Sequence, residues 1–327
     1  MTFIDFCSGI GAGRLGLEKL GLRCLAHSEI NAEVDSTYKI FFNDKNNLGD
    51  LTAIPYEKVP IADILIAGFP CQTFSIVGKR AGFNDIRGQI IYHLADILKF
   101  KNIPYFIFEN VKGLVNHDKG KTFENIIDLL NNAGYEVYTK VLNSIDYGVP
   151  QLRERIYFVG IRKDLCNKPF LFPLPQQNVE IKNFLLPFNN DILDIQNPTF
   201  QKYLNNKYNK GRININEILK KNYLVVDTRQ SDLRIYDNKC PTLRTGRHGI
   251  LYVKNGELHK LNGVEALLLQ GFPKEYVLKS KGINNNKLLS QAGNAMTVCV
   301  INEIGKSLIK YIEDNDNGFG SKRFANC

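Results

Sequence analysis

A short apolar run at residues 61–67, Ile-Ala-Asp-Ile-Leu-Ile-Ala, constrains the fold more than any other feature of this sequence. Runs of this length that are rich in branched residues are typical of strands buried in a parallel sheet. Gly68 and Pro70 follow and prevent the strand from continuing. Cys71 is therefore predicted on a loop at the carboxyl end of a strand, the edge where open α/β sheets bind ligands. Cysteine is most often a small core residue, but the polar residues around Cys71 favour a functional thiol.

The N-terminal region predicts a nucleotide cradle. A predicted strand at residues 2–6 leads into the turn Gly-Ile-Gly-Ala-Gly at residues 9–13 and then into a helical pattern that ends at Gly21. A second predicted strand, residues 23–28, ends at Glu29, about 20 residues beyond the glycines, where acidic side chains accept hydrogen bonds from a ribose. Together these features indicate an adenosine-like ligand, although glycine turns and strand-end carboxylates also occur in proteins without one.

Further polar residues are predicted at the same edge of the sheet. Asp50 follows a glycine, and Glu109 ends an aromatic strand on the same edge as Cys71. Glu109 could donate a proton to a ligand, or it could cap the helix that follows. Arg153 and Arg155 are two residues apart, so an extended backbone places them on one face. Their planar groups suit a carbonyl or a phosphate, or are simply solvated.

Two loops, residues 75–88 and 227–253, combine glycines with basic side chains. The first is either a mobile lid or an ordinary solvated loop. Donors on such loops suit phosphate groups and base edges, and the formal net charge of +9 suits a polyanionic partner. The residues that we predict to contact DNA are Ser75, Lys79, Arg80, Arg87, Arg244, Arg247 and His248.

The chain of 327 residues is long enough for one large and one small domain. From about Pro169, prolines end the alternation of strands and helices, and residues 203–224 are rich in Asn, Lys and Tyr. Apolar residues persist there, so we expect a small irregular domain and not a disordered segment. The predicted division is a main domain of residues 1–170 plus 280–327 and a second domain with its hinge at residues 171–279.

The seven cysteines form an odd number without Cys-x-x-Cys spacing, which argues against a disulfide framework and against a zinc site. We expect no metal. No apolar run approaches the length that spans a bilayer, and the sequence begins with a predicted strand. We therefore expect a soluble cytoplasmic protein.

In this order, the motifs resemble those of the DNA cytosine-5 methyltransferases of bacterial restriction-modification systems. The matching residues are the turn from Asp5 to Gly11, Glu29, Asp50, Gly68-Phe69-Pro70-Cys71-Gln72, Glu109-Asn110-Val111, Gln151 to Arg155, Gly271-Phe272-Pro273 and Gly293-Asn294. Each motif alone is weak, but the combination is specific. The resemblance implies an α/β fold: a Rossmann-like S-adenosylmethionine domain, closed by the C-terminal helix, with a small, mostly β or irregular target-recognition domain inserted.

The resemblance also implies the chemistry. Cys71 would add to C6 of a cytosine flipped out of double-stranded DNA. Glu109 would hydrogen-bond or protonate N3, Arg155 would hold O2, and Asn110 and Arg153 would support the pocket and the loop. The methyl group would come from S-adenosylmethionine, which leaves as S-adenosylhomocysteine.

For the cofactor, the resemblance points to Phe6, Cys7, Gly9, Gly11, Glu29, Ile30, Asp50, Pro70 and Asn294. The sequence departs from the family pattern at three positions. Cys7 stands where the family usually has a phenylalanine that stacks on adenine, and Ile30 stands where an aromatic residue is often found. Ala12 replaces a second consecutive glycine. We expect these changes to alter cofactor affinity without abolishing function.

Three alternatives remain open. A tRNA cytosine-5 methyltransferase would share the catalytic motifs but generally lacks a large recognition domain. A nicotinamide-dependent oxidoreductase would share the glycine turn and Glu29 but leaves Cys71 and Glu109 unexplained. A DNA-binding module with a decayed site would not need Cys71, Glu109 and Arg155 together. For the methyltransferase we expect a monomer near the nucleoid, with a companion restriction endonuclease as a possible partner.

Overall fold

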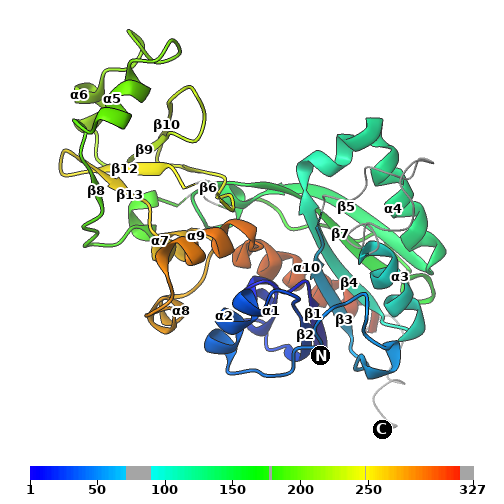
Figure 1. The fold of residues 1–327 in the computed structure, drawn as a ribbon. Coiled ribbons are helices and arrows are strands. Elements are labelled where there is room, and N and C mark those ends of the chain that lie inside the picture. Colours follow the sequence, from blue (N-terminus) through cyan, green and yellow to red (C-terminus); the bar gives the residue numbers. More distant parts are fainter. Residues whose placement is uncertain (71–89, 177–178, 247, 317–327) are drawn as a thin grey trace. The chain divides into compact units, whose positions relative to one another are not determined.

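The computed structural model describes residues 1–70, 90–176, 179–246 and 248–316. The chain forms two compact units, drawn in Figure 1. Unit 1 contains residues 1–142, 154–175 and 296–327, and unit 2 contains residues 143–153 and 176–295. The division into functional domains at residues 170 and 280 stays a prediction.

Unit 1 is built on a mixed sheet, six-stranded within the described residues, in the order β2-β1-β3-β4-β7-β5. Its strands are β1 (Thr2–Phe6), β2 (Arg23–Ser28), β3 (Ile64–Gly68), β4 (Tyr105–Val111), β5 (Tyr135–Asn143) and β7 (Glu154–Arg162). The run that opened the sequence analysis forms β3, which is buried and pairs in parallel with β1 and β4. β7 runs antiparallel to β4. This arrangement confirms the predicted Rossmann-like α/β fold.

Five helices of the described residues accompany this sheet: α1 (Ala12–Glu18), α2 (Ala32–Phe42), α3 (Ile90–Phe100), α4 (Lys121–Asn132) and α10 (Val298–Asp316). The C-terminal helix α10 packs on α1 (Figure 1). A Cβ atom on Gly16 would lie 2.7 Å from Cβ of Ile301, so the glycine allows the two helices to approach closely. The Asn302 amide donates a hydrogen bond to the Gly16 carbonyl at 3.0 Å. These contacts join the two ends of the described chain.

Unit 2 contains a second sheet, in the order β10-β9-β12-β13-β8, with every printed pair antiparallel. The strands are β8 (Ile192–Leu193), β9 (Leu224–Asp227), β10 (Arg234–Asp237), β12 (Ile250–Lys254) and β13 (Glu257–Lys260). Two very short strands, β6 (Gln151–Leu152) and β11 (Cys240–Pro241), pair in parallel. Val226, Val253 and Leu258 are fully buried in its core. The predicted second domain of mostly β and irregular structure is thereby confirmed as a fold.

The helices of unit 2 are α5 (Pro198–Leu204), α6 (Ile215–Leu219), α7 (Gly263–Leu269), α8 (Lys274–Lys279) and α9 (Asn285–Asn294). Short 3-10 helices occur at Tyr56–Lys58, Lys112–Gly120, Ser144–Tyr147, Lys163–Leu165 and Ile181–Phe184. Within the part of the chain that the structure describes, no helix is both long and apolar enough to cross a membrane.

Candidate active site

The ends of β3 and β4 bring the first two motifs together. The two strands are parallel, and Gly68 is the register partner of Glu109. Glu109 therefore lies beside the point where the chain leaves the sheet toward Cys71. Cys71 itself lies outside the described residues, as do Ser75, Lys79, Arg80 and Arg87 of the following loop.

The backbone before that loop is anchored from two sides. The buried ring of Phe69 lies 6.1 Å from the Phe108 ring and 6.2 Å from the Phe158 ring, centroid to centroid. The buried Asn110 amide donates to the Phe69 carbonyl at 3.0 Å, and its oxygen accepts from the Val111 backbone at 2.8 Å. The aromatic packing and the Asn110 bond fix the residue that precedes Pro70, so the loop begins from a defined position.

Replacing Asn110 with alanine should therefore impair catalysis. The buried Phe69 carbonyl would lose this partner, which costs about 1–3 kcal/mol of stability. A small displacement of the loop start should lower the single-turnover methylation rate by about 10- to 100-fold. Thermal unfolding and single-turnover kinetics measure both effects. Asn205→Ala, which removes an exposed amide bond to the Gln201 carbonyl, should change neither, and a full rate in Asn110→Ala would contradict the anchoring role.

Glu109 and Arg155 form the ion pair at this edge. The Arg155 Nε atom lies 3.1 Å from Oε1 of Glu109, with side chains 13% and 11% exposed. Val111, two residues after Glu109, is the register partner of Arg155, which explains their proximity. Within the described residues, the buried Oε1 atom accepts no hydrogen bond of good geometry. The pair thus presents an acidic group and a planar cation side by side, a combination that suits the edge of a pyrimidine.

Arg153 differs from the sequence expectation. We predicted Arg153 and Arg155 on one face of an extended strand, but β6 ends at Leu152 and β7 begins at Glu154. The fully buried Arg153 guanidinium group donates to three carbonyl groups of unit 2. These belong to Leu243 at 3.2 Å, Gly293 at 3.1 Å and Ala295 at 2.8 Å. The expectation of a shared face is therefore wrong, and Arg153 serves as a brace of unit 2.

Gln151 belongs to the same brace. Its Nε2 atom donates to the Leu269 carbonyl at 2.9 Å, and its Oε1 atom accepts from the Leu243 backbone at 3.1 Å. The sequence motif Gln-x-Arg-x-Arg thus has two functions in the structure. Its first two polar residues join segments of unit 2, and its last residue, Arg155, faces Glu109.

The glycine turn after β1 and the acidic end of β2 meet in unit 1. The Gly9 backbone donates to Oε2 of Glu29 at 3.0 Å, and the Asn31 backbone donates to Oε1 at 2.8 Å. Burial raises the pKa of Glu29 above its ordinary value, opposed by these hydrogen bonds. A Cβ atom on Gly9 would meet no described atom within 4 Å. The open backbone and the carboxylate fit an adenosine-containing cofactor.

Gly11 makes this turn sensitive to substitution. Its φ angle is +82°, and an added Cβ atom would lie 2.2 Å from Cε2 of Phe42. Gly21 has the same kind of backbone, φ +81°, but no described atom within 4 Å of the added Cβ. Gly11→Ala should therefore cost more than the roughly 1–2 kcal/mol of backbone strain that both variants share, and it should weaken S-adenosylmethionine binding. Thermal unfolding and calorimetric titration compare the two variants; equal effects would show that the Phe42 contact does not matter.

Other predicted cofactor residues occupy varied positions. Phe6 is fully buried in the core of unit 1, so its ring does not face a ligand. Cys7 is half-buried with φ 49°, and burial raises the pKa of its thiol to about 12. Ile30 is 72% exposed. Oδ1 of Asp50 accepts two hydrogen bonds from Thr52, through its backbone and its hydroxyl group.

Two remaining cofactor positions lie at the ends of described segments or elements. Pro70 is exposed and is the last residue described before the Cys71 loop. Asn294 is exposed at the end of α9 in unit 2. Among the described residues, no group of three or more His, Cys, Asp or Glu side chains could hold a metal ion.

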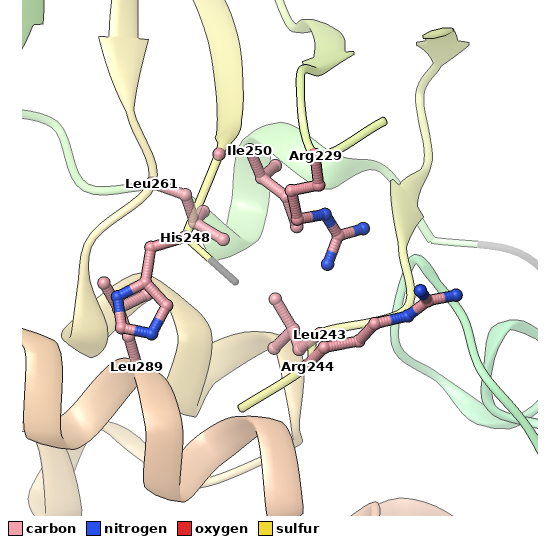
Figure 2. Close-up of a pocket in the computed structure, with 8 residues that line it drawn as sticks. Arg229, Leu243, Arg244, His248, Ile250, Leu261 and Leu289 are labelled. Atoms are coloured by element: carbon pink, nitrogen blue, oxygen red, sulfur yellow. The ribbon is translucent and has the colours of Figure 1, made fainter. Parts of the chain in front are cut away.

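The candidate DNA contacts of unit 2 surround a small pocket (Figure 2). Its lining residues are Arg229, Leu243, Arg244, His248, Gly249, Ile250, Leu261 and Leu289. Arg244 is exposed and extends away from Leu243 in Figure 2, and the exposed His248 lies 3.2 Å from the Ser290 hydroxyl through Nε2. Arg247 lies outside the described residues. The structure thus places two of the three predicted unit 2 contacts beside one pocket.

Comparison with solved structures defines the class of protein. The chain resembles the Dnmt2 methyltransferase of Schizosaccharomyces pombe, titled S. pombe, with a TM-score of 0.71 at 17% sequence identity, over 96% of this chain and 98% of that one. At this identity the likeness shows the fold, which is that of a methyltransferase with a Rossmann-like sheet.

Comparison of sequences then gives the family. The family model of the C-5 cytosine-specific DNA methylases matches residues 1–310. The chain is 37% identical to the type II methyltransferase M.NgoBI of Neisseria gonorrhoeae, covering 96% of both, and 38% identical to M.HaeII of Haemophilus aegyptius, covering 94% of this chain and 92% of the relative. The chain belongs to the C-5 cytosine-specific DNA methylase family. Its enzyme class is therefore DNA cytosine-5 methyltransferase, which confirms the resemblance drawn from the motifs.

Proposed function

We propose that this enzyme methylates C5 of one cytosine within a short, specific sequence of double-stranded DNA, through a covalent bond between Cys71 and C6. The observation that carries the proposal is the pairing of Glu109 with Arg155 beside the strand end that leads to Cys71. A nicotinamide-dependent oxidoreductase has no use for this pair. Family membership favours DNA over tRNA as the substrate.

The proposed mechanism begins at Cys71. C5 of cytosine is a weak nucleophile, so the thiolate first adds to C6 and makes C5 an enamine carbon. Glu109 hydrogen-bonds or protonates N3 and draws electron density from the ring during this addition, while Arg155 binds O2. When bound, S-adenosylmethionine supplies an electrophilic methyl group to C5 and becomes S-adenosylhomocysteine. Loss of the C5 proton to a base then breaks the bond between sulfur and C6, which restores the aromatic ring and the free thiolate.

The cofactor would lie against the glycine turn. We propose that Glu29 binds the ribose hydroxyl groups, that Asp50 binds the adenine amino group, and that the backbone at Gly9 and Gly11 faces the methionine portion. The open space above Gly9 and the position of Glu29 support this assignment. Ile30 and Cys7 offer little aromatic surface for adenine, so we expect weaker stacking than in relatives with aromatic residues there.

Access to C5 and C6 requires that the target base leave the duplex stack. We propose that residues 75–88 close over the flipped base, with Lys79, Arg80 and Arg87 on phosphate groups. Arg244, Arg247 and His248 of unit 2 would read the recognition sequence. The names of the type II relatives support a role in a restriction-modification system, in which a companion endonuclease would cut the same unmethylated site. We propose a monomer that works in the cytoplasm on nucleoid DNA.

The test uses the purified protein, methyl-labelled S-adenosylmethionine and genomic DNA that lacks cytosine methylation, followed by mapping at base resolution. Label on C5 of cytosine at one short motif is the expected result. A tRNA sample is assayed in parallel. Label on tRNA alone, or none on either substrate while the cofactor is bound, would refute the proposed DNA specificity.

A further inference from the structure

The recognition segment of unit 2 is tethered at both ends to the two residues that follow Asp227. At one end, the Arg229 Nη1 atom donates to the Thr242 carbonyl at 2.8 Å. At the other end, the Thr228 backbone and hydroxyl group both donate to the Gly249 carbonyl, at 2.8 and 3.0 Å. Arg244 and His248 lie between these two tethered residues. The segment from Thr242 to Gly249 thus starts and ends on one short turn after β9.

The Arg229 side chain is itself rigidly held. Asp227 accepts three hydrogen bonds from Arg229: Oδ1 from the backbone at 3.0 Å and from Nε at 2.7 Å, and Oδ2 from Nη2 at 2.8 Å. Both side chains are only 6% exposed. Burial raises the pKa of Asp227, but the hydrogen bonds from Arg229 leave it below its ordinary value, so the pair stays ionised. A planar guanidinium group on a bidentate partner has little freedom to move.

The pair is used for position and not for contact with solvent. A guanidinium group that reads DNA directly needs exposed donors, as the exposed Arg244 has. Figure 2 shows Arg229 on the wall of the pocket opposite His248, with Leu243 below it. The clamp packs tightly, because a Cβ atom on Gly249 would lie 2.8 Å from the Thr228 hydroxyl and 3.1 Å from Cγ of Arg229.

We propose that Arg229 is a positioning residue for sequence discrimination, which fixes the segment carrying Arg244 and His248 through Asp227 and Thr242. The proposal rests on the proposed function, because it assumes that this segment reads DNA. Through a chain of fixed contacts, Asp227 orients Arg229, Arg229 holds Thr242, and the segment then presents its donors at a defined place. Loss of the clamp should leave the chemistry intact and blur the choice of sequence.

Arg229→Lys tests the proposal, because lysine keeps the charge but lacks the planar fork that binds Asp227 and Thr242 together. The ratio of kcat/KM at the cognate site to kcat/KM at sites with one changed base pair should fall by about tenfold or more. The single-turnover rate at saturating cognate DNA should stay within about threefold. A residue that bound a phosphate group would instead weaken cognate and altered sites equally in this variant.

Arg234→Lys is the matched control. Arg234 also pairs with an aspartate two residues away, Asp232, at 3.0 Å, but this pair is 50% and 37% exposed and holds no loop. Its discrimination ratio should equal that of the wild type. Arg244→Ala should lower the ratio without changing the melting temperature, which shows independently that the segment reads DNA.

Gly249→Ala and Thr228→Val decide the question if Arg229→Lys does not fold. Each disturbs the clamp without changing a charge, and each should lower the discrimination ratio. Folded clamp variants with the ratio of the wild type would overturn the proposal while the proposed function stands. A wild-type enzyme that methylates no defined motif would instead refute the proposed function, and with it the proposal.

Discussion

Cys71→Ser is expected to abolish methyl transfer, with a loss of activity on the order of 10⁴ or more. A serine hydroxyl group is far less ionised than a thiol near neutral pH and is a weaker nucleophile, so addition to C6 should not occur at a useful rate. Binding of S-adenosylmethionine should remain, because the assigned cofactor contacts lie on other residues. Single-turnover transfer of a labelled methyl group and calorimetric titration of the cofactor measure the two properties separately.

Cys24→Ser serves as its control. Burial raises the pKa of the Cys24 thiol to about 12, and its sulfur lies 3.4 Å from the Ala26 carbonyl as a hydrogen-bond donor. This thiol is not a candidate nucleophile, and its loss should leave the rate within about threefold. Near-normal turnover in Cys71→Ser would remove Cys71 from the mechanism.

Glu109→Gln should give the second large effect. Glutamine keeps the shape of the side chain but can neither protonate N3 nor form an ion pair with Arg155. Since general acid catalysis contributes about 10²- to 10⁴-fold, the single-turnover rate should fall by that factor. Affinity for the duplex should change only a few-fold, because most of the binding energy comes from contacts to phosphate groups.

The control for this change is Glu154→Gln. Glu154 lies next to Arg155 in β7 and forms an exposed ion pair with Lys112 at 2.9 Å. Exposed pairs contribute little to stability, so this variant should methylate at the rate of the wild type. An unchanged single-turnover rate in Glu109→Gln would contradict the role assigned to the carboxyl group.

Local pattern was sufficient to predict the sheet of unit 1 and the position of Glu109. The branched residues of β3 must be buried on both faces, and parallel neighbours place their carboxyl ends at one edge. The register of Gly68 with Glu109 follows from that rule. Nothing comparable fixed the sheet of unit 2, because its strands pair across long stretches of chain, as β8 does with β13.

The functions of single polar residues were harder to predict, because burial and distant partners decide them. Arg153 and Arg155 look equivalent in the sequence, yet Arg153 binds carbonyl groups at Leu243, Gly293 and Ala295, 90 or more positions away. Arg229 was recognised as a basic residue of a loop, but its ionic partner Asp227 was not identified. Two residues of opposite charge this close in sequence give no sign of whether water or protein surrounds them.

The covalent step is the central claim, and trapping it tests the account most directly. A duplex that carries 5-fluorocytosine at the mapped target position is incubated with the enzyme and S-adenosylmethionine, and the protein is digested and analysed by mass spectrometry. Fluorine at C5 cannot leave as a proton does, so elimination stops after methyl transfer. The account predicts a methylated fluorocytosine adduct on the peptide that contains Cys71. An adduct on another cysteine, or turnover of ordinary DNA with no adduct from the fluorinated duplex, would contradict it.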